Sequence, residues 1–169
     1  MNAMKRTVIF FSLLLAVTRM SAGDLDKFFG IHTGVLYPRI YNITLSYEKE
    51  TSYHNAWEAY VDYATQWDKC KTCGKVCIDS FWKERYSYAF GAAYKPAVGR
   101  GKNSVTRMRF GADLGSCNRG FALGVEIGLE YVVTTWSGIQ FVFQQKNEVT
   151  FWGKPTFKNG MLVGMRFPL

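Results

Sequence analysis

Apolar and polar residues alternate along residues 121–134, and this stretch sets the expectation for the whole chain. Every second residue of FALGVEIGLEYVVT is apolar, whereas the residues between them are mostly small or acidic. Because successive side chains of a strand point to opposite sides, this pattern predicts a two-sided strand. Soluble strands usually have ~5–6 residues, and a transmembrane barrel strand needs ~9–11 with an apolar outer side. The stretch alone fits a half-buried soluble strand or a membrane strand, so the rest of the chain must decide.

The same alternation recurs along the chain. We expect eight strands, over residues 30–37, 41–48, 57–66, 85–95, 106–115, 121–134, 139–144 and 160–169. An even number of strands places both termini on one side, as in single-chain outer-membrane barrels. The connections 38–39, 68–82, 116–120 and 150–157 would then lie on the outside, and 49–54, 96–102 and 135–138 on the periplasmic side. We predict an all-β fold, an eight-stranded antiparallel up-and-down transmembrane β-barrel.

Charged residues gather on one side of the predicted strands. In a soluble core, each unpaired buried charge would cost several kcal/mol. The interior of a membrane barrel can instead hold them as a network that plugs the lumen. A soluble sandwich or lipocalin-like barrel, with its apolar side inward, remains the alternative. The predicted lumenal charge network consists of Arg85, Arg107, Arg109, Asp113, Glu126 and Glu130; Glu48, Glu58, Asp62, Lys95 and Arg166 also fall on the inward side.

The chain begins with a basic segment, residues 1–6, followed by an apolar run, 7–17, that is too short to span a bilayer. Small residues near position 22 suit cleavage, so we predict a signal peptide over 1–22 and a barrel over 23–169. An N-terminal membrane anchor is the alternative. The formal charge of +8 would fall to +5 on cleavage, because the segment contains three basic residues and no acidic one. The remaining cations are scattered, so we expect no direct nucleic-acid binding.

The chain ends in an alternating stretch whose apolar side reaches Phe167 and Leu169. This ending resembles the closing strand of outer-membrane barrels. We therefore expect the protein in the outer membrane, with outer-membrane lipid as the partner of its apolar face.

Four cysteines follow the predicted signal peptide. Cys70, Cys73 and Cys77 lie in one connection and Cys117 next to another, both at the outer end. In an exported chain we expect two disulfides, one within residues 68–82 and one tying that connection to Cys117. The sequence does not choose among the three pairings. A zinc or iron–sulfur site is the alternative; we predict neither a metal nor another cofactor.

The sequence shows no catalytic constellation. A lipid hydrolase would need a nucleophile beside a base and an orienting acid. His32 is expected in the lumen, as part of a polar network, and His54 at a periplasmic turn, and no serine stands near either on the lipid-facing side. We therefore predict that the protein is not an enzyme. A barrel-type lipid-modifying enzyme is the rival hypothesis.

The last part of the chain resembles TraO, a conjugative-transposon protein of Bacteroidetes. The resemblance rests on the acidic alternating strand at 125–131, the turn at 135–138, the strand at 141–146, Trp152-Gly153 and the glycine-rich strand at 160–167. It implies a non-enzymatic outer-membrane component of a conjugation apparatus, with other conjugation or envelope proteins as partners. Our hypothesis is a structural or docking role in a DNA-transfer or cell-envelope assembly. A surface adhesin or stability barrel is a further alternative.

Overall fold

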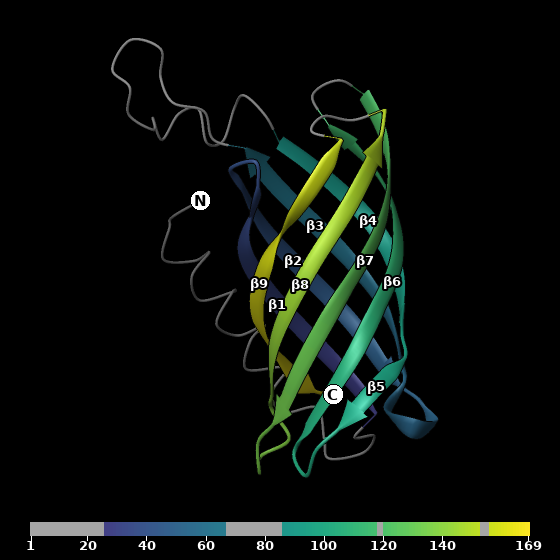
Figure 1. Ribbon diagram of the computed structural model, residues 1–169, viewed down its shortest axis with the longest axis vertical. Coiled ribbons are helices and arrows are strands. Elements are labelled where there is room, and N and C mark those ends of the chain that lie inside the picture. Colours follow the sequence, from purple (N-terminus) through teal and green to yellow (C-terminus); the bar gives the residue numbers. More distant parts are fainter. Residues whose placement is uncertain (1–25, 67–85, 118–119, 153–155) are drawn as a thin grey trace, which may run out of the picture.

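The computed structural model describes residues 26–66, 86–117, 120–152 and 156–169. These residues form nine strands and one short 3-10 turn, η1 (Ser52–His54). None of them forms a helix long and apolar enough to cross a membrane. Figure 1 labels the strands around the barrel. The strands are β1 (Lys27–Tyr37), β2 (Ile40–Glu50), β3 (Ala56–Gln66), β4 (Tyr86–Lys95), β5 (Ala97–Arg100), β6 (Ser104–Cys117), β7 (Gly120–Thr134), β8 (Gln140–Phe151) and β9 (Phe157–Pro168).

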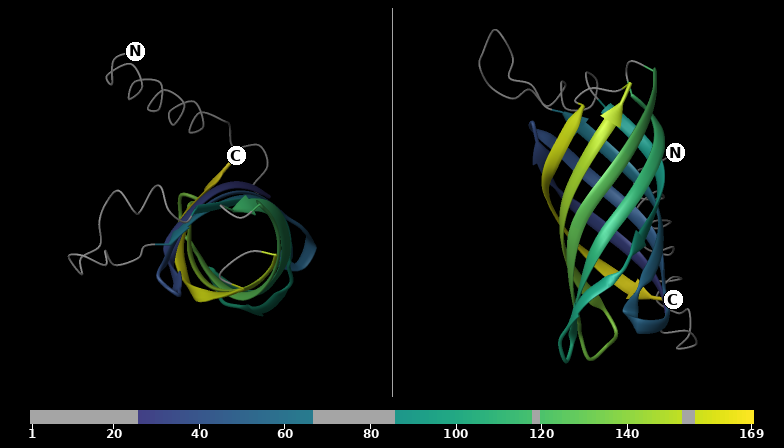
Figure 2. Two further views of the ribbon diagram at one scale, coloured as in Figure 1. Left: turned by 90° about the horizontal axis from the view of Figure 1, so that it is seen from above. Right: turned by 45° about the vertical axis from the view of Figure 1, so that its right-hand side comes forward.

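The strands form a single antiparallel sheet that closes on itself. Each strand other than β5 pairs with the next full-length strand in the chain, and β1 pairs with β9 to close the ring. The short strand β5 continues β4 after Pro96 and pairs with the same partner, β6, so the two occupy one position in the wall. Pro96 has no N–H to donate to the ladder, which accounts for the interruption. Figure 2 shows the closed ring from above. The predicted eight-stranded up-and-down barrel is confirmed.

The barrel turns its apolar side outward. Val125 and Ile127 are each 49 % exposed, whereas Glu126 and Glu130 between and beside them are 2 % and 0 % exposed. The same division holds around the wall, where exposed Val, Leu, Ile, Phe, Tyr and Met side chains alternate with buried polar ones. An apolar exterior around a polar interior is the arrangement of a transmembrane barrel. The soluble alternative, with the apolar side inward, is wrong.

The two ends of the barrel differ. The termini end holds Lys27 and Leu169, joined by a backbone hydrogen bond of 2.9 Å from Leu169 N to Lys27 O. It also holds the connections between β2 and β3, β5 and β6, and β7 and β8. The loop end holds the connections after β1, β3, β6 and β8. This division matches the grouping expected from the strand count. Residues 1–25, including the predicted signal peptide, lie outside the described residues.

Several strand limits differ from those predicted. The largest difference is in β8, which continues to Phe151 although we expected it to end at Gln144. The outward alternation is interrupted there, because Gln145 and Asn147 are polar residues on the outer side. The predicted loop 150–157 is therefore too long, and the predicted turn 96–102 contains β5.

Candidate functional site

The interior of the barrel is filled by charged side chains, which form the candidate site. Among the described residues, six buried cations face seven buried carboxylates. They divide into two groups that Arg109 joins. The termini-end cluster comprises Glu48, Glu58, Lys95, Arg107, Glu130 and Arg166, and the loop-end cluster comprises Asp62, Asp113, Glu126, Lys146, Glu148 and Lys158.

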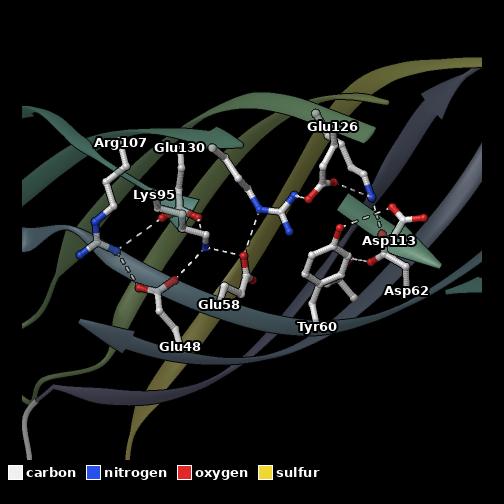
Figure 3. A network of polar contacts seen from close by, with 12 residues as sticks. Glu48, Glu58, Tyr60, Asp62, Lys95, Arg107, Asp113, Glu126 and Glu130 are labelled. Atoms are coloured by element: carbon white, nitrogen blue, oxygen red, sulfur yellow. Dashed lines mark hydrogen bonds and ion pairs between the residues drawn. The ribbon is translucent and has the colours of Figure 1, made fainter. Parts of the chain in front are cut away.

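Lys95 is the centre of the termini-end cluster (Figure 3). Its Nζ lies 2.7 Å from Glu48 Oε2, 2.7 Å from Glu58 Oε2 and 2.8 Å from Glu130 Oε2. Glu48 and Glu58 stand directly opposite each other on β2 and β3. Like charges in that position repel each other. The ammonium from β4 offsets this repulsion and also contacts Glu130 from β7, two positions further along the wall.

Two arginines surround this centre. Arg166 Nη1 donates to Glu48 Oε1 at 3.1 Å, and Arg166 also pairs with Glu130. Arg107 Nη1 lies 2.6 Å from Glu48 Oε1, and its Nε donates to the backbone oxygen of His54 at 2.8 Å. Arg107 thus ties the interior to η1, which lies at the termini end.

Arg109 connects the two clusters at mid-lumen. Its Nε lies 3.0 Å from Glu58 Oε2, and its Nη1 pairs with Glu126. The guanidinium also lies over the ring of Tyr60, 4.5 Å from the ring centroid, a cation–π arrangement. The ring has room because residue 91 is glycine: a Cβ there would collide with ring atoms of Tyr60.

Lys146 occupies the centre of the loop-end cluster. It pairs with Asp62, and its Nζ lies 3.2 Å from both Glu126 Oε2 and Glu148 Oε2. Glu126 and Glu148 also stand opposite each other, on β7 and β8. A lysine therefore bridges an opposed carboxylate pair in each cluster.

The three carboxylates around Lys146 have the chemistry of a cation site. One oxygen from each of Asp62, Glu126 and Glu148 lies within 4.8 Å of the others. Oxygen ligands of this kind suit Ca²⁺ or Mg²⁺. The Lys146 ammonium already contacts all three, so the protein supplies its own cation there.

A small pocket adjoins the loop-end cluster. Asp62, Asp113, Glu148 and Lys158 line it, together with Cys117 and other residues near the loop end. Its volume is about 30 Å³, room for about two water molecules. That volume is too small for a lipid or nucleotide.

The structure places five of the six residues of the predicted network in the interior. Arg107 Nη1 lies 3.6 Å from Glu130 Oε1, and Arg109 pairs with Glu126. Asp113 stands apart: among the described residues it accepts one hydrogen bond, from Tyr60 Oη at 3.4 Å. Arg85 lies outside the described residues.

The predicted strand limits missed Lys146 and Glu148, because the seventh strand was expected to end at Gln144. They also missed Lys158, because the last strand was expected to begin at residue 160 and begins at Phe157. The inward alternation Gln144, Lys146, Glu148, Thr150 was the pattern that could have revealed the first two.

His32 is inside the barrel, as expected, and is 1 % exposed. Its ring nitrogens form no hydrogen bond with the described residues, so it is not part of the polar network it was expected to join. His54 lies at the termini end, where its Nδ1 pairs with Glu50. Cys117 ends β6 at the loop end, half-buried and without a disulfide to any described residue. Cys70, Cys73 and Cys77 lie outside the described residues, so the two disulfides stay a prediction.

A closed antiparallel barrel with an apolar wall and a charged interior defines a transmembrane β-barrel. No protein-family model matches the chain, and no curated protein matches it. Among solved structures, the chain is similar to a major outer membrane protein from Thermus thermophilus. The match has a TM-score of 0.53 and 9 % identity and covers 85 % of this chain and 98 % of that one. At this identity the likeness concerns the fold. The comparisons give no support to the resemblance to TraO or to an origin in Bacteroidetes.

Proposed function

We propose that this protein is a non-enzymatic outer-membrane barrel with a closed lumen, serving as a structural or docking component of a cell-envelope assembly. The observation that carries the proposal is the interior ion-pair network. Eight strands enclose a space that side chains can just fill. Here the filling side chains reach across the lumen, since Lys146 on β8 pairs with Asp62 on β3, on the opposite side of the ring, and Arg107 on β6 contacts Glu48 on β2.

A lipid-modifying enzyme is the weaker candidate. His32 and the Ser46 hydroxyl both border Gly30, yet both are buried inside the barrel and neither bonds the other. A lipid acyl chain in the bilayer would meet the outer wall and not these groups. If His32→Gln altered the acylation pattern of cellular lipid A, the enzymatic hypothesis would replace ours.

Conductance measurements test the closed lumen. We expect the full chain in planar bilayers to show no conductance steps under conditions in which a porin conducts. The variant Tyr60→Ser/Arg109→Ser is the matched comparison, because it shortens the two stacked side chains at mid-lumen and should open a path. Heat-modifiable gel mobility verifies that both proteins are folded. Stable conductance by the unaltered chain would contradict the proposal.

More specifically, we propose that the assembly is a conjugation apparatus. The sequence resemblance to TraO supports this role. Deleting the gene in a donor cell should lower transfer of the mobile element, and restoring the gene should recover it. If transfer is unchanged but envelope permeability changes, the role in a cell-envelope assembly is supported and the role in conjugation is rejected. Loss of cell attachment alone would favour the adhesin alternative.

A further inference from the structure

Three amide side chains interrupt the apolar outer wall of the barrel. Gln145 and Asn147 on β8 and Asn159 on β9 point outward and are partly exposed. Asn147 and Asn159 are direct neighbours across the two strands. We call these three residues the amide patch. Apolar residues surround it, including Phe143 and Val149 on β8.

The patch lies at mid-height in the wall. Asn147 is aligned with Ile127, the middle residue of the outward row of β7, which runs from Phe121 to Val133. A rise of ~3.3 Å per residue and a tilt of ~40° place the two ends of that row about 15 Å above and below Ile127. A hydrocarbon core is ~30 Å thick, so the patch lies near its centre.

The patch keeps unused hydrogen-bonding capacity. Asn147 Oδ1 accepts from Gln145 Nε2 at 3.1 Å and also from Asn159 Nδ2, and Asn147 Nδ2 donates to the backbone oxygen of Ile127 at 3.1 Å. Each amide group carries two N–H donors and one acceptor oxygen. Gln145 Oε1 and Asn159 Oδ1 accept no bond from any described residue. Lipid tails can satisfy none of these groups.

We propose that two copies of this chain associate within the membrane through their amide patches. The patch is uncharged and presents donors and acceptors together, so it is complementary to itself. A twofold axis through it would pair the free donors of each copy with the free acceptors of the other. A charged partner is disfavoured, because it would bring an ion to the centre of the bilayer. The inference rests on the transmembrane placement and is independent of the closed lumen.

Photo-crosslinking of the full chain tests this contact. The chain is reconstituted in phosphatidylethanolamine–phosphatidylglycerol vesicles with p-benzoylphenylalanine at position 161 or at position 90. Met161 stands opposite Gln145 and is strongly exposed, whereas Phe90 is similarly exposed but lies on β4, on the far side of the ring. We expect a product of twice the chain mass from position 161 and none from position 90. No dimer from position 161, or equal yields from both positions, would overturn the proposal.

Removing the amides should separate the two copies. The variant Gln145→Leu/Asn147→Leu/Asn159→Leu should lower the dimer yield about tenfold, the change expected when a few amide hydrogen bonds within the bilayer are lost. Tyr88→Phe, which removes one polar atom from the opposite wall, should leave the yield unchanged. Gel mobility checks folding, and Asn159→Leu alone serves if the triple variant does not fold. An unchanged dimer yield in a folded patch variant would show that the two copies do not associate through the patch. The same conclusion would follow if crosslinking from position 161 in cell envelopes gave a heavier product that contains a different protein.

Discussion

The termini-end and loop-end clusters both neutralise a pair of opposed carboxylates with a lysine, but they differ in how far water reaches them. Each contains a pair of carboxylates that face each other across neighbouring strands, and each places a lysine between them. In the termini-end cluster the lysine, Lys95, is 0 % exposed and two arginines enclose it. In the loop-end cluster the outermost cation, Lys158, has a side chain that is 10 % exposed, and a water-sized pocket adjoins it. The termini end is thus the sealed part of the lumen.

This difference predicts where the removal of a charge should lower the stability of the barrel most. A buried charge left without its partner costs several kcal/mol, whereas water can relieve a charge near an opening. We therefore expect the cost of removing a lysine to fall from the sealed cluster towards the open one.

The largest effect is expected for Lys95→Met. This change leaves Glu48, Glu58 and Glu130 without their shared ammonium, and should lower the free energy of unfolding by about 3–5 kcal/mol. Urea titration in lipid vesicles, followed by tryptophan fluorescence, measures the loss. Lys49→Met at the same end is the control, because Lys49 is exposed on the outer side, and it should cost about 0.5 kcal/mol or less. Equal effects of the two changes would remove the distinction between sealed and exposed charges.

Lys146→Met should destabilise the barrel by about 2–3 kcal/mol, less than Lys95→Met, because the loop-end pocket admits water. The variant also empties the centre of the Asp62, Glu126 and Glu148 group. Calcium should then restore part of the stability of the variant and leave the unaltered chain unaffected. Melting temperatures with and without millimolar CaCl₂ measure this. If calcium leaves the melting temperature of the variant unchanged, the three carboxylates do not form a cation site.

Lys158→Met should cost about 1 kcal/mol, because the Lys158 side chain borders the water-sized pocket and pairs with one carboxylate, Glu148, in the described residues. A double-mutant cycle with Glu148→Gln isolates the coupling between the two. A coupling energy as large as the loss in Lys95→Met would make the loop-end cluster as closed as the termini-end one.

The smallest effect is expected for Tyr60→Phe. The change removes the long hydrogen bond to Asp113 and keeps the ring beneath Arg109. We expect a loss of about 0.5 kcal/mol. Tyr60→Leu, which also removes the aromatic face, should cost more, and the difference between the two variants measures the contribution of the Arg109–ring contact. Equal losses of stability in the two variants would show that the Arg109–ring contact does not stabilise the barrel.

The barrel could be predicted from the sequence because the alternation of side chains along a strand is a local property of the backbone. The alternation identified which residues face inward, including Arg107, Arg109, Glu126 and Glu130. It failed where the outer row turned polar at Gln145 and Asn147, since the expected contrast between the two sides disappeared there. Lys146 and Glu148 were not predicted to face inward because the predicted strand ended at that interruption.

What the sequence by itself determined is the two-sidedness of each strand, because side-chain alternation is local. The tertiary structure decided that the apolar side faces outward and the charged side lines the lumen. Only the tertiary structure decided which charges meet. Arg166 on β9 reaches Glu48 on β2 because the pairing of β1 with β9 closes the ring. Lys95 on β4 reaches Glu130 on β7 because both strands pair with β6. Ion pairs across a lumen depend on distances that closure sets, and no local pattern of residues encodes those distances.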